Sequence, residues 1–189
     1  MKSVGALLIL LLGLLSGCST LPLGEPQASL DNLERIRRSP VAPLDVGAFT
    51  RGAGVSAADD KSHGVRSNSV VAPRGSFAAY LGETLRAELS GAGRYQRGAP
   101  LVLRGQLLET TLDGSSTRQG TASLAARFEL LRDQSVVYRS ELRVADRWDS
   151  AFIGVEAIPA AVNHYQDLYR RLVGQLFGDA KFIEAARAR

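Results

Sequence analysis

The sequence predicts an α+β fold: a two-layer sandwich in which a mostly antiparallel sheet of about four to five strands carries two main helices on one face, plus a short C-terminal helix. Two observations predict it. Apolar and polar residues alternate along segments 120–131 and 136–147, which is typical of strands with one buried face. Apolar residues recur at helical spacing along segments 77–91 and 157–177. Each segment therefore has one apolar face to bury.

The first 17 residues have the features of a signal peptide. Lys2 gives a short positive region, and Val4 to Leu15 form an apolar run of twelve residues, well short of the roughly 20 that span a bilayer. The run is followed by Leu-Ser-Gly-Cys, ending at Cys18, which resembles the lipobox of bacterial lipoproteins. The alternative is a plain secretory signal with an incidental cysteine.

The lipobox resemblance implies that the Cys18 thiol receives a diacylglycerol, that the leader is cut before this cysteine, and that the new amino terminus is acylated. Two or three acyl chains, palmitate among them, would give a lasting membrane anchor, because one chain binds only reversibly. By the same resemblance, Ser19 after the cysteine implies sorting to the outer membrane, with the domain facing the periplasm.

Residues 18–40 are expected to form a lipidated flexible tether, and residues 41–189 the periplasmic domain. The stretch 19–40 holds three prolines and scattered charge, although Leu30, Leu33 and Ile36 allow a short turn of helix.

The domain is expected to begin with a strand over 41–49, in which Leu44, Val46 and Ala48 share one face. Small and polar residues over 50–68 predict the longest and most mobile loop. A short strand at 70–71 would then return beside the first strand.

Ser76 is a suitable N-cap for the helix over 77–91, which ends at Gly91. A strand over 101–109 and a turn at 113–116 lead into the hairpin.

In the hairpin, charges on the outward face can pair across the strands for a few tenths to about 1 kcal/mol each, which favours a register without forming a binding site. These residues are Arg127, Glu129, Arg139, Glu141 and Arg143. The helix over 157–177 tolerates Pro159 in its first turn, and Asp179 can cap a short final helix that holds Phe182 and Ile183.

Composition excludes several functions. The net charge of +4 is weak and scattered, so nucleic acid is not an expected partner. Cys18 is the only cysteine, which excludes a disulfide framework and a cysteine-based zinc site. With two histidines and no nucleophile or phosphate-loop motif, we expect no catalytic residues, no cofactor, no metal site and no enzymatic activity.

The two histidines are expected to be unremarkable. His63 lies in the polar loop near Asp59 and Asp60, where we expect solvated charge rather than a weak metal site, because no second imidazole or thiolate is near in the sequence. His164, beside Tyr165, is expected at the surface or an edge.

Two basic pairs have open interpretations. Arg37-Arg38 would meet anionic headgroups or simply belong to a soluble linker. The pair at 170–171 is expected on a solvated helix face.

Several short motifs resemble the YajG-type family of uncharacterised bacterial lipoproteins. They are the lipobox cysteine, Asp-Val-Gly at 45–47, Arg-Gly-Ser-Phe at 74–77, the turn at 91–95, Ala-Ala-Val-Asn at 160–163 and Asp-Ala-Lys-Phe-Ile at 179–183. More loosely, the layout is similar to auxiliary lipoproteins of ABC-type transport systems that move lipid between membranes. Neither resemblance supplies catalytic residues.

The expected function is therefore a non-enzymatic binding or assembly accessory of the cell envelope, held in the membrane through its lipid anchor and contacting an envelope protein through the sheet edge or open sheet face. The alternative is an auxiliary lipoprotein of an ABC-type lipid transport system, with a lipid ligand between helices and sheet. A continuous apolar cavity would favour the alternative; a filled core with an exposed apolar patch would favour the first.

Overall fold

The computed structural model describes residues 19–188, so the expected signal peptide over 1–17 and the expected lipidation site at Cys18 lie outside the described residues. The elements, in chain order, are β1 (Thr20–Pro22), α2 (Leu30–Arg38), β2 (Asp45–Arg51), β3 (Ser62–Val65), β4 (Asn68–Val71), the 3-10 turn η1 (Pro73–Gly75), α3 (Phe77–Gly91), β5 (Leu101–Asp113), β6 (Gln119–Arg132), β7 (Ser135–Asp149), α4 (Gly154–Leu176) and α5 (Ala180–Ala185).

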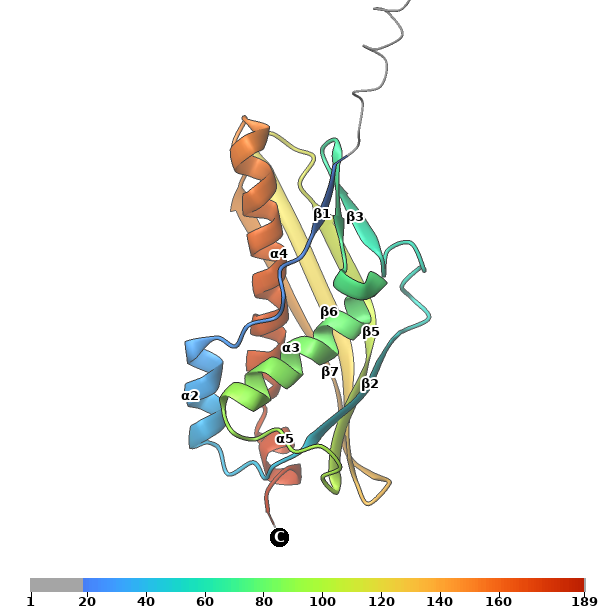
Figure 1. Ribbon diagram of the computed structural model, residues 1–189, viewed down its shortest axis with the longest axis vertical. Coiled ribbons are helices and arrows are strands. Elements are labelled where there is room, and N and C mark those ends of the chain that lie inside the picture. Colours follow the sequence, from blue (N-terminus) through green and yellow to red (C-terminus); the bar gives the residue numbers. More distant parts are fainter. Residues whose placement is uncertain (1–18, 189) are drawn as a thin grey trace, which may run out of the picture.

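The main sheet has the strand order β2-β5-β6-β7. Strand β2 runs parallel to β5, and the other neighbours are antiparallel. Helix α3 packs against β2 and β5, and α4 packs against β6 and β7, so both helices cover one face of this sheet (Figure 1). The predicted α+β class with two helices on one face is confirmed, and α2 adds a third helix beside α3 and α4.

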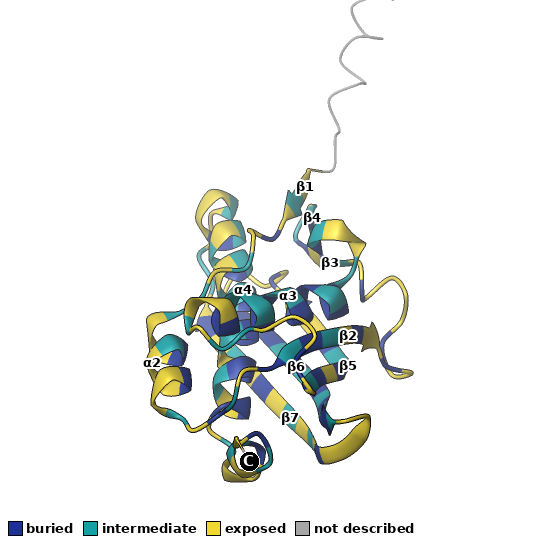
Figure 2. Cartoon of the chain, turned by 60° about the horizontal axis from the view of Figure 1, so that its bottom comes forward, coloured by how far each residue is buried: buried dark blue, intermediate teal, exposed yellow. Residues whose placement is uncertain are grey.

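The hairpin of β6 and β7 forms as predicted. Ala122, Leu124, Ala126, Phe128 and Leu130 are all buried, and the alternation along both strands is visible in Figure 2. The turn between the strands places Asp133 and Gln134 at φ 48° and 70°, the left-handed backbone that matches the twist of a tight hairpin.

Strand β2 differs from its predicted alternation. The register with β5 shifts between Val46 and Phe49, so Phe49 points into the core and Ala48 is exposed. The Phe49 ring lies over Gly105 of β5, where an added Cβ would come within 2.5 Å of it, and meets Phe128 edge-on with centroids 6.0 Å apart. A glycine on the neighbouring strand thus makes room for a large aromatic side chain.

A second sheet occupies the region expected to be a long loop. Its order is β1-β4-β3, with β4 antiparallel to β3 and parallel to β1. The expected loop over 50–68 therefore contains a strand, and the strand at 68–71 does not return beside β2. Val65 of β3, Val70 of β4 and Val55 in the preceding loop are buried, which explains how so polar a segment is held.

The N-cap of α3 is confirmed. The Ser76 Oγ accepts the amide of Ala79 at 3.1 Å and donates to the Asp60 Oδ2 at 2.8 Å. The Asp60 Oδ1 accepts the Ala78 amide at 2.9 Å, so a carboxylate faces the positive end of the helix.

The last two helices are close to their predicted positions. Helix α4 begins at Gly154, a turn before the expected start, so Pro159 lies inside the helix beyond its first turn. Asp179 caps α5 as expected, accepting the Lys181 amide at 2.8 Å, and its other oxygen accepts the Tyr138 hydroxyl at 2.7 Å.

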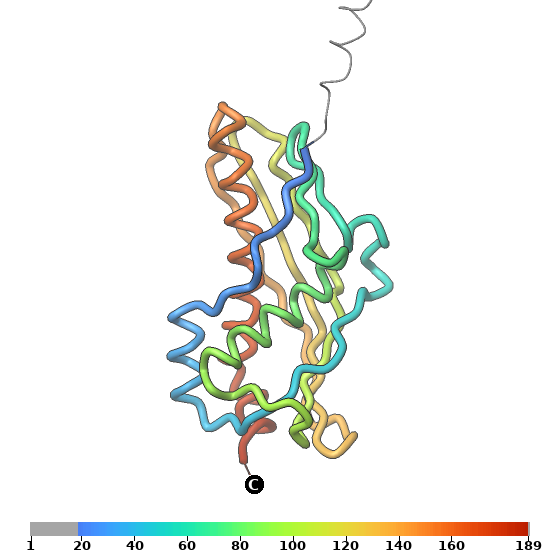
Figure 3. The backbone as a smooth tube through the Cα atoms, viewed as in Figure 1, coloured from blue at the N-terminus to red at the C-terminus, as the bar shows by residue number. Residues whose placement is uncertain are grey.

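The expectation of an extended, flexible tether over 18–40 is wrong for its described part, residues 19–40. The segment forms β1 and α2 and follows α3 and α4 across the domain (Figure 3). Tyr80 donates its hydroxyl to the Gly24 carbonyl at 3.0 Å, and Leu23 and Ile36 are buried. Prolines here shape a packed, irregular connection rather than a free linker.

A buried polar cluster joins α2 to α3 and α4. The Asn32 amide nitrogen donates to the Glu88 Oε1 at 2.8 Å and to the Arg170 carbonyl at 2.9 Å, and the Ser29 amide donates to the Glu88 Oε2 at 3.0 Å. Burial raises the pKa of the Glu88 carboxyl, although these hydrogen bonds oppose that effect. Gly174 allows the close approach, because a Cβ there would lie 2.7 Å from the Asn32 Oδ1.

Replacing Asn32→Ala should lower the free energy of unfolding by about 2 kcal/mol or more, because the Glu88 carboxyl and the Arg170 carbonyl lose their donor while staying buried. Urea denaturation followed by circular dichroism measures it. Glu34→Ala, which removes an exposed ion pair on the same helix, is the control and should cost less than about 0.5 kcal/mol. Equal losses in the two variants would contradict the role given to this cluster.

Candidate functional site

The end of the domain nearest the expected lipidation site is firmly held. Ser19, the first described residue, accepts the Ser69 amide at its carbonyl, at 3.1 Å, and donates its hydroxyl to the Asn68 side chain. Strand β1 follows at once, and the Leu23 amide donates to the Val71 carbonyl at 3.1 Å. The backbone is therefore hydrogen-bonded to β4 from Ser19, the residue after Cys18, to Leu23.

The face of the main sheet opposite α3 and α4 carries the predicted cross-strand charges. Arg127 on β6 pairs with Glu141 on β7 at 2.6 Å. Glu129 on β6 accepts from Arg104 on β5 at 2.9 Å and from Arg139 on β7 at 2.7 Å. The hydrogen bond from Arg104, together with that from Arg139, holds the pKa of the Glu129 carboxyl below its ordinary value. We call these five residues the charge ladder.

The charge ladder lines an open groove of about 750 Å³ on this face. Its lining also includes Ala48 and Thr50 of β2 and Gln106 of β5. Arg143 on β7 extends the pattern by pairing with Glu109 on β5 at 2.5 Å. Side chains in ion pairs have already lost much of their conformational freedom. A partner that docks here therefore causes a smaller loss of side-chain entropy than it would on an unpaired charged surface.

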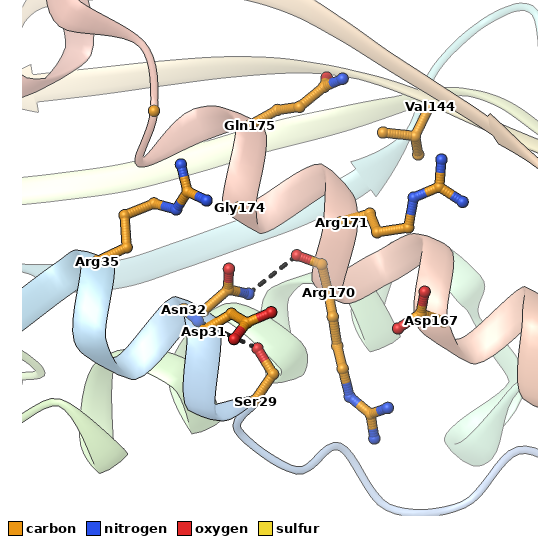
Figure 4. A pocket seen from close by; sticks show the side chains of 11 residues that line it. Ser29, Asp31, Asn32, Arg35, Val144, Asp167, Arg170, Arg171, Gly174 and Gln175 are labelled. Carbon is orange, nitrogen blue, oxygen red and sulfur yellow. Dashed lines mark hydrogen bonds between the residues drawn. The ribbon is translucent and has the colours of Figure 1, made fainter.

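A second groove, of about 610 Å³, lies between α2 and α4 (Figure 4). Helix α2 contributes Asp31 and Arg35, and α4 contributes Asp167 and Arg171, so charges of both signs surround it. Its floor is the Asn32 contact with the Arg170 carbonyl, drawn as a dashed line in Figure 4. This groove is open and polar.

His63 is not the solvated charge that the sequence predicts. It lies on β3 with 9% of its surface exposed, stacked on Phe77 with ring centroids 5.1 Å apart. Its Nε2 is 3.0 Å from the Thr110 Oγ1. The surrounding residues are polar in sequence, and only the pairing of β3 with β4 over α3 and α4 brings this ring into the core.

Three hydroxyls continue the contact of His63 into the interior. The hydroxyls of Thr110 and Tyr165 are hydrogen-bonded, and the Tyr169 hydroxyl donates to that of Tyr165 at 3.1 Å. Burial raises the pKa of the Tyr165 hydroxyl above its ordinary range. Burial also lowers the pKa of His63, opposed in part by the charge of Asp59. His63 and the three hydroxyls thus form a polar network in which each group has a hydrogen-bond partner, within an aromatic core.

The predictions for His164 and for the two basic pairs are confirmed only in part. His164 lies at an edge, as predicted, stacked on Trp148 and 2.8 Å from Asp146. Arg171 contacts the same Asp146 at 3.4 Å, so it joins α4 to β7 instead of pointing freely into solvent. In the other pair, Arg37 donates to the Gly91 carbonyl at 2.7 Å, and Arg38 is exposed.

Two features were missed in the sequence analysis: the buried carboxylate of Glu88 and a group of exposed apolar residues before α4. Glu88 occupies a position of the apolar stripe of α3, which is the signal that could have identified a buried carboxylate. Phe152 and Ile153, just before α4, and Val155, in its first turn, are exposed apolar residues. No periodicity in the sequence distinguishes them from core residues.

Within residues 19–188, no cluster of three or more histidine, cysteine or acidic side chains is arranged to hold a metal ion. None of the helices in this part of the chain combines the length and apolar character that crossing a bilayer requires.

The fold defines a class: an antiparallel sheet with one parallel edge strand, helices on one face and a small second sheet. A DUF330-family protein from Xanthomonas campestris is similar to this chain, with a TM-score of 0.55 and 14% identity over 85% of this chain and 96% of that one. Weaker similarities are to a candidate lipoprotein from Caulobacter crescentus (TM-score 0.48, 12% identity, 84% and 98% covered) and a minor lipoprotein from Acinetobacter baumannii (0.44, 12%, 79% and 97%). No protein-family model and no curated protein sequence matches the chain.

The buried His63 should make the fold acid-sensitive. In the unfolded chain His63 binds a proton as the pH falls below its ordinary pKa of 6.5, whereas in the folded chain it does so only at a lower pH. The free energy of unfolding should therefore fall as the pH drops below about 6.5, by up to about 1.4 kcal/mol per pH unit. His63→Phe should remove this slope in urea titrations across that range, while His164→Gln should keep it. An unchanged slope in His63→Phe would contradict the assignment.

Proposed function

We propose that this chain is a lipid-anchored protein of the outer membrane, with its domain in the periplasm, and that it acts without catalysis as a binding or assembly accessory of the cell envelope. The lipobox ending at Cys18 supports the anchor, and Ser19 supports the outer membrane as its destination. The motifs resembling the YajG-type lipoproteins support the same placement in the cell envelope.

The observation that carries the binding role is the uncovered face of the main sheet. Within residues 19–188, helices cover only the opposite face, and the charge ladder fills this one with guanidinium and carboxylate groups held in fixed positions. Arginine is favoured at protein interfaces, and charges on such a face select partners by complementarity. Each arginine of the ladder keeps donors that its ion pair does not use, so carboxylates on an envelope protein could bind them.

The interior supports surface binding over lipid handling. Between α3 and α4, aromatic side chains are in edge-on contact: Phe77 against Tyr165 with centroids 5.3 Å apart, and Tyr80 against Tyr169 at 4.9 Å. The Tyr165 hydroxyl also reaches Thr110 of β5, so this packing extends to the sheet. An acyl chain would have to displace this packing, which costs several kcal/mol for each large side chain moved. The two grooves described above are open, and charged residues line them.

Cys18→Ala should leave the domain folded and move it out of the membrane fraction, because the described fold begins after this residue and the acyl chains supply the anchor. Fractionation of cells, with circular dichroism of the purified variant, measures both. Processing of the wild type should be sensitive to globomycin. A wild type that fractionates as soluble protein, with processing that is insensitive to globomycin, would contradict the anchor.

Arg127→Glu should weaken capture of the envelope partner by at least tenfold, because it breaks the pair with Glu141 and sets two carboxylates together on the open face. Affinity purification from solubilised envelopes with quantitative mass spectrometry measures the recovery. Arg38→Glu, which reverses an exposed charge on α2 away from the sheet, is the matched control and should capture as the wild type does. Equal capture by both variants would place the partner elsewhere.

A further inference from the structure

An apolar projection stands at one end of the molecule, where the chain passes from β7 into α4. Phe152, Ile153 and Val155 expose 81%, 59% and 78% of their surfaces. We call these three residues the apolar tip. Exposed aromatic and aliphatic side chains gathered within four residues are costly in water and mark a surface that another apolar phase covers.

The apolar tip is held in place by hydrogen bonds to its backbone. Arg66, in the turn between β3 and β4, donates to the Phe152 carbonyl at 2.9 Å and to the Ala151 carbonyl at 2.5 Å. The Ile153 carbonyl accepts the Ala157 amide at 3.1 Å as α4 begins. These hydrogen bonds give the carbonyls of Ala151, Phe152 and Ile153 their partners and fix the backbone that presents the tip.

The same turn connects the apolar tip to the expected anchor. Asn68, two residues after Arg66, receives the Ser19 hydroxyl, and the Ser19 carbonyl accepts the Ser69 amide. Figure 1 shows the start of β1, the β3–β4 turn and the start of α4 at one end of the molecule, with the C-terminus at the other. Cys18 directly precedes Ser19 in the chain, and one trans peptide bond separates neighbouring Cα atoms by about 3.8 Å.

We infer that the apolar tip inserts into the phospholipid surface in which the Cys18 acyl chains are anchored. The inference rests on the proposed lipidation of Cys18. Because Ser19 is hydrogen-bonded to β4 and the sheet begins at Thr20, the anchor leaves no length of free chain with which the domain could move away from the bilayer. A phospholipid surface is therefore the apolar phase within reach of Phe152, Ile153 and Val155, and phenylalanine and aliphatic side chains are those that bury at such a boundary.

Insertion would set the orientation of the whole domain. Helix α4 and strands β5 to β7 extend from this end along the long axis of the molecule (Figure 1), so they would rise away from the membrane. The charge ladder would then face sideways into the periplasm, and the β6–β7 turn would lie at the end of the domain away from the bilayer. Two contacts with the membrane, the acyl chains and the apolar tip, restrict rotation in a way that the acyl chains alone do not.

The test uses the lipidated full-length protein carrying Phe152→Cys, labelled with nitrobenzoxadiazole, in vesicles of phosphatidylethanolamine and phosphatidylglycerol. Cys18 is the only other cysteine, and lipidation consumes its thiol, so the label reports one site. We expect emission at shorter wavelength than in detergent-free buffer, and strong quenching by lipids with a nitroxide on the acyl chain. Val136→Cys is the matched control: an exposed apolar residue in the β6–β7 hairpin at the opposite end, whose label should remain in water.

Flotation of the vesicles distinguishes a failure of the lipid anchor from a failure of the apolar tip to insert. Labelled protein that floats with the vesicles while its Phe152 label stays in water, or whose labels at 152 and 136 are quenched alike, overturns the insertion of the tip and leaves the anchor standing. A label at 152 that is buried only when an envelope protein is added also overturns it, in favour of a protein partner. Protein that does not float contradicts the proposed lipid anchor, and the inference falls with it.

Discussion

The pairing of β1 with β4 is the constraint on which the rest of the account depends. It begins at Thr20, two residues after Cys18, and the first described residue, Ser19, is already hydrogen-bonded to β4 rather than lying on a linker. The expected lipid anchor is therefore joined to a folded body directly, and the end of the domain that holds the anchor is also the end that presents the apolar tip. Location, orientation and the direction in which the open sheet face points all follow from this pairing.

Much of the fold could be predicted from local patterns. The hairpin, the N-cap at Ser76 and the stripes of α3 and α4 follow from periodicity within one segment, because each of these elements must bury one face. The elements that were missed or only partly predicted depend on contacts between distant segments. Helix α2, for which the spacing of Leu30, Leu33 and Ile36 indicated only a short turn, is held by Asn32 against Glu88. Strand β1, which was missed, is held by residues near position 69. The shift of register in β2 depends on the space that Gly105 leaves for Phe49.

The features of the candidate site also fall into those that follow from a local pattern and those that depend on contacts between distant segments. The charge ladder follows from the alternation of β6 and β7, because residues on one face of paired strands must meet across them. His63 was misplaced because glycine and charged residues surround it in the chain, whereas its stacking on Phe77 and its contact with Thr110 come from three different elements. The apolar tip was not recognised because Phe152 and Ile153 look like core residues until the fold shows that nothing in the described part of the chain covers them.

The account is tested most directly by the intact mass of the native protein purified from membranes. It predicts a chain that begins at Cys18, directly before the strand that enters the small sheet, with the added mass of a diacylglycerol and an amino-terminal acyl group. A chain that retains its leader, or that carries a free thiol at Cys18 and no acyl mass, would contradict the anchor, and with it the position of the domain at the membrane.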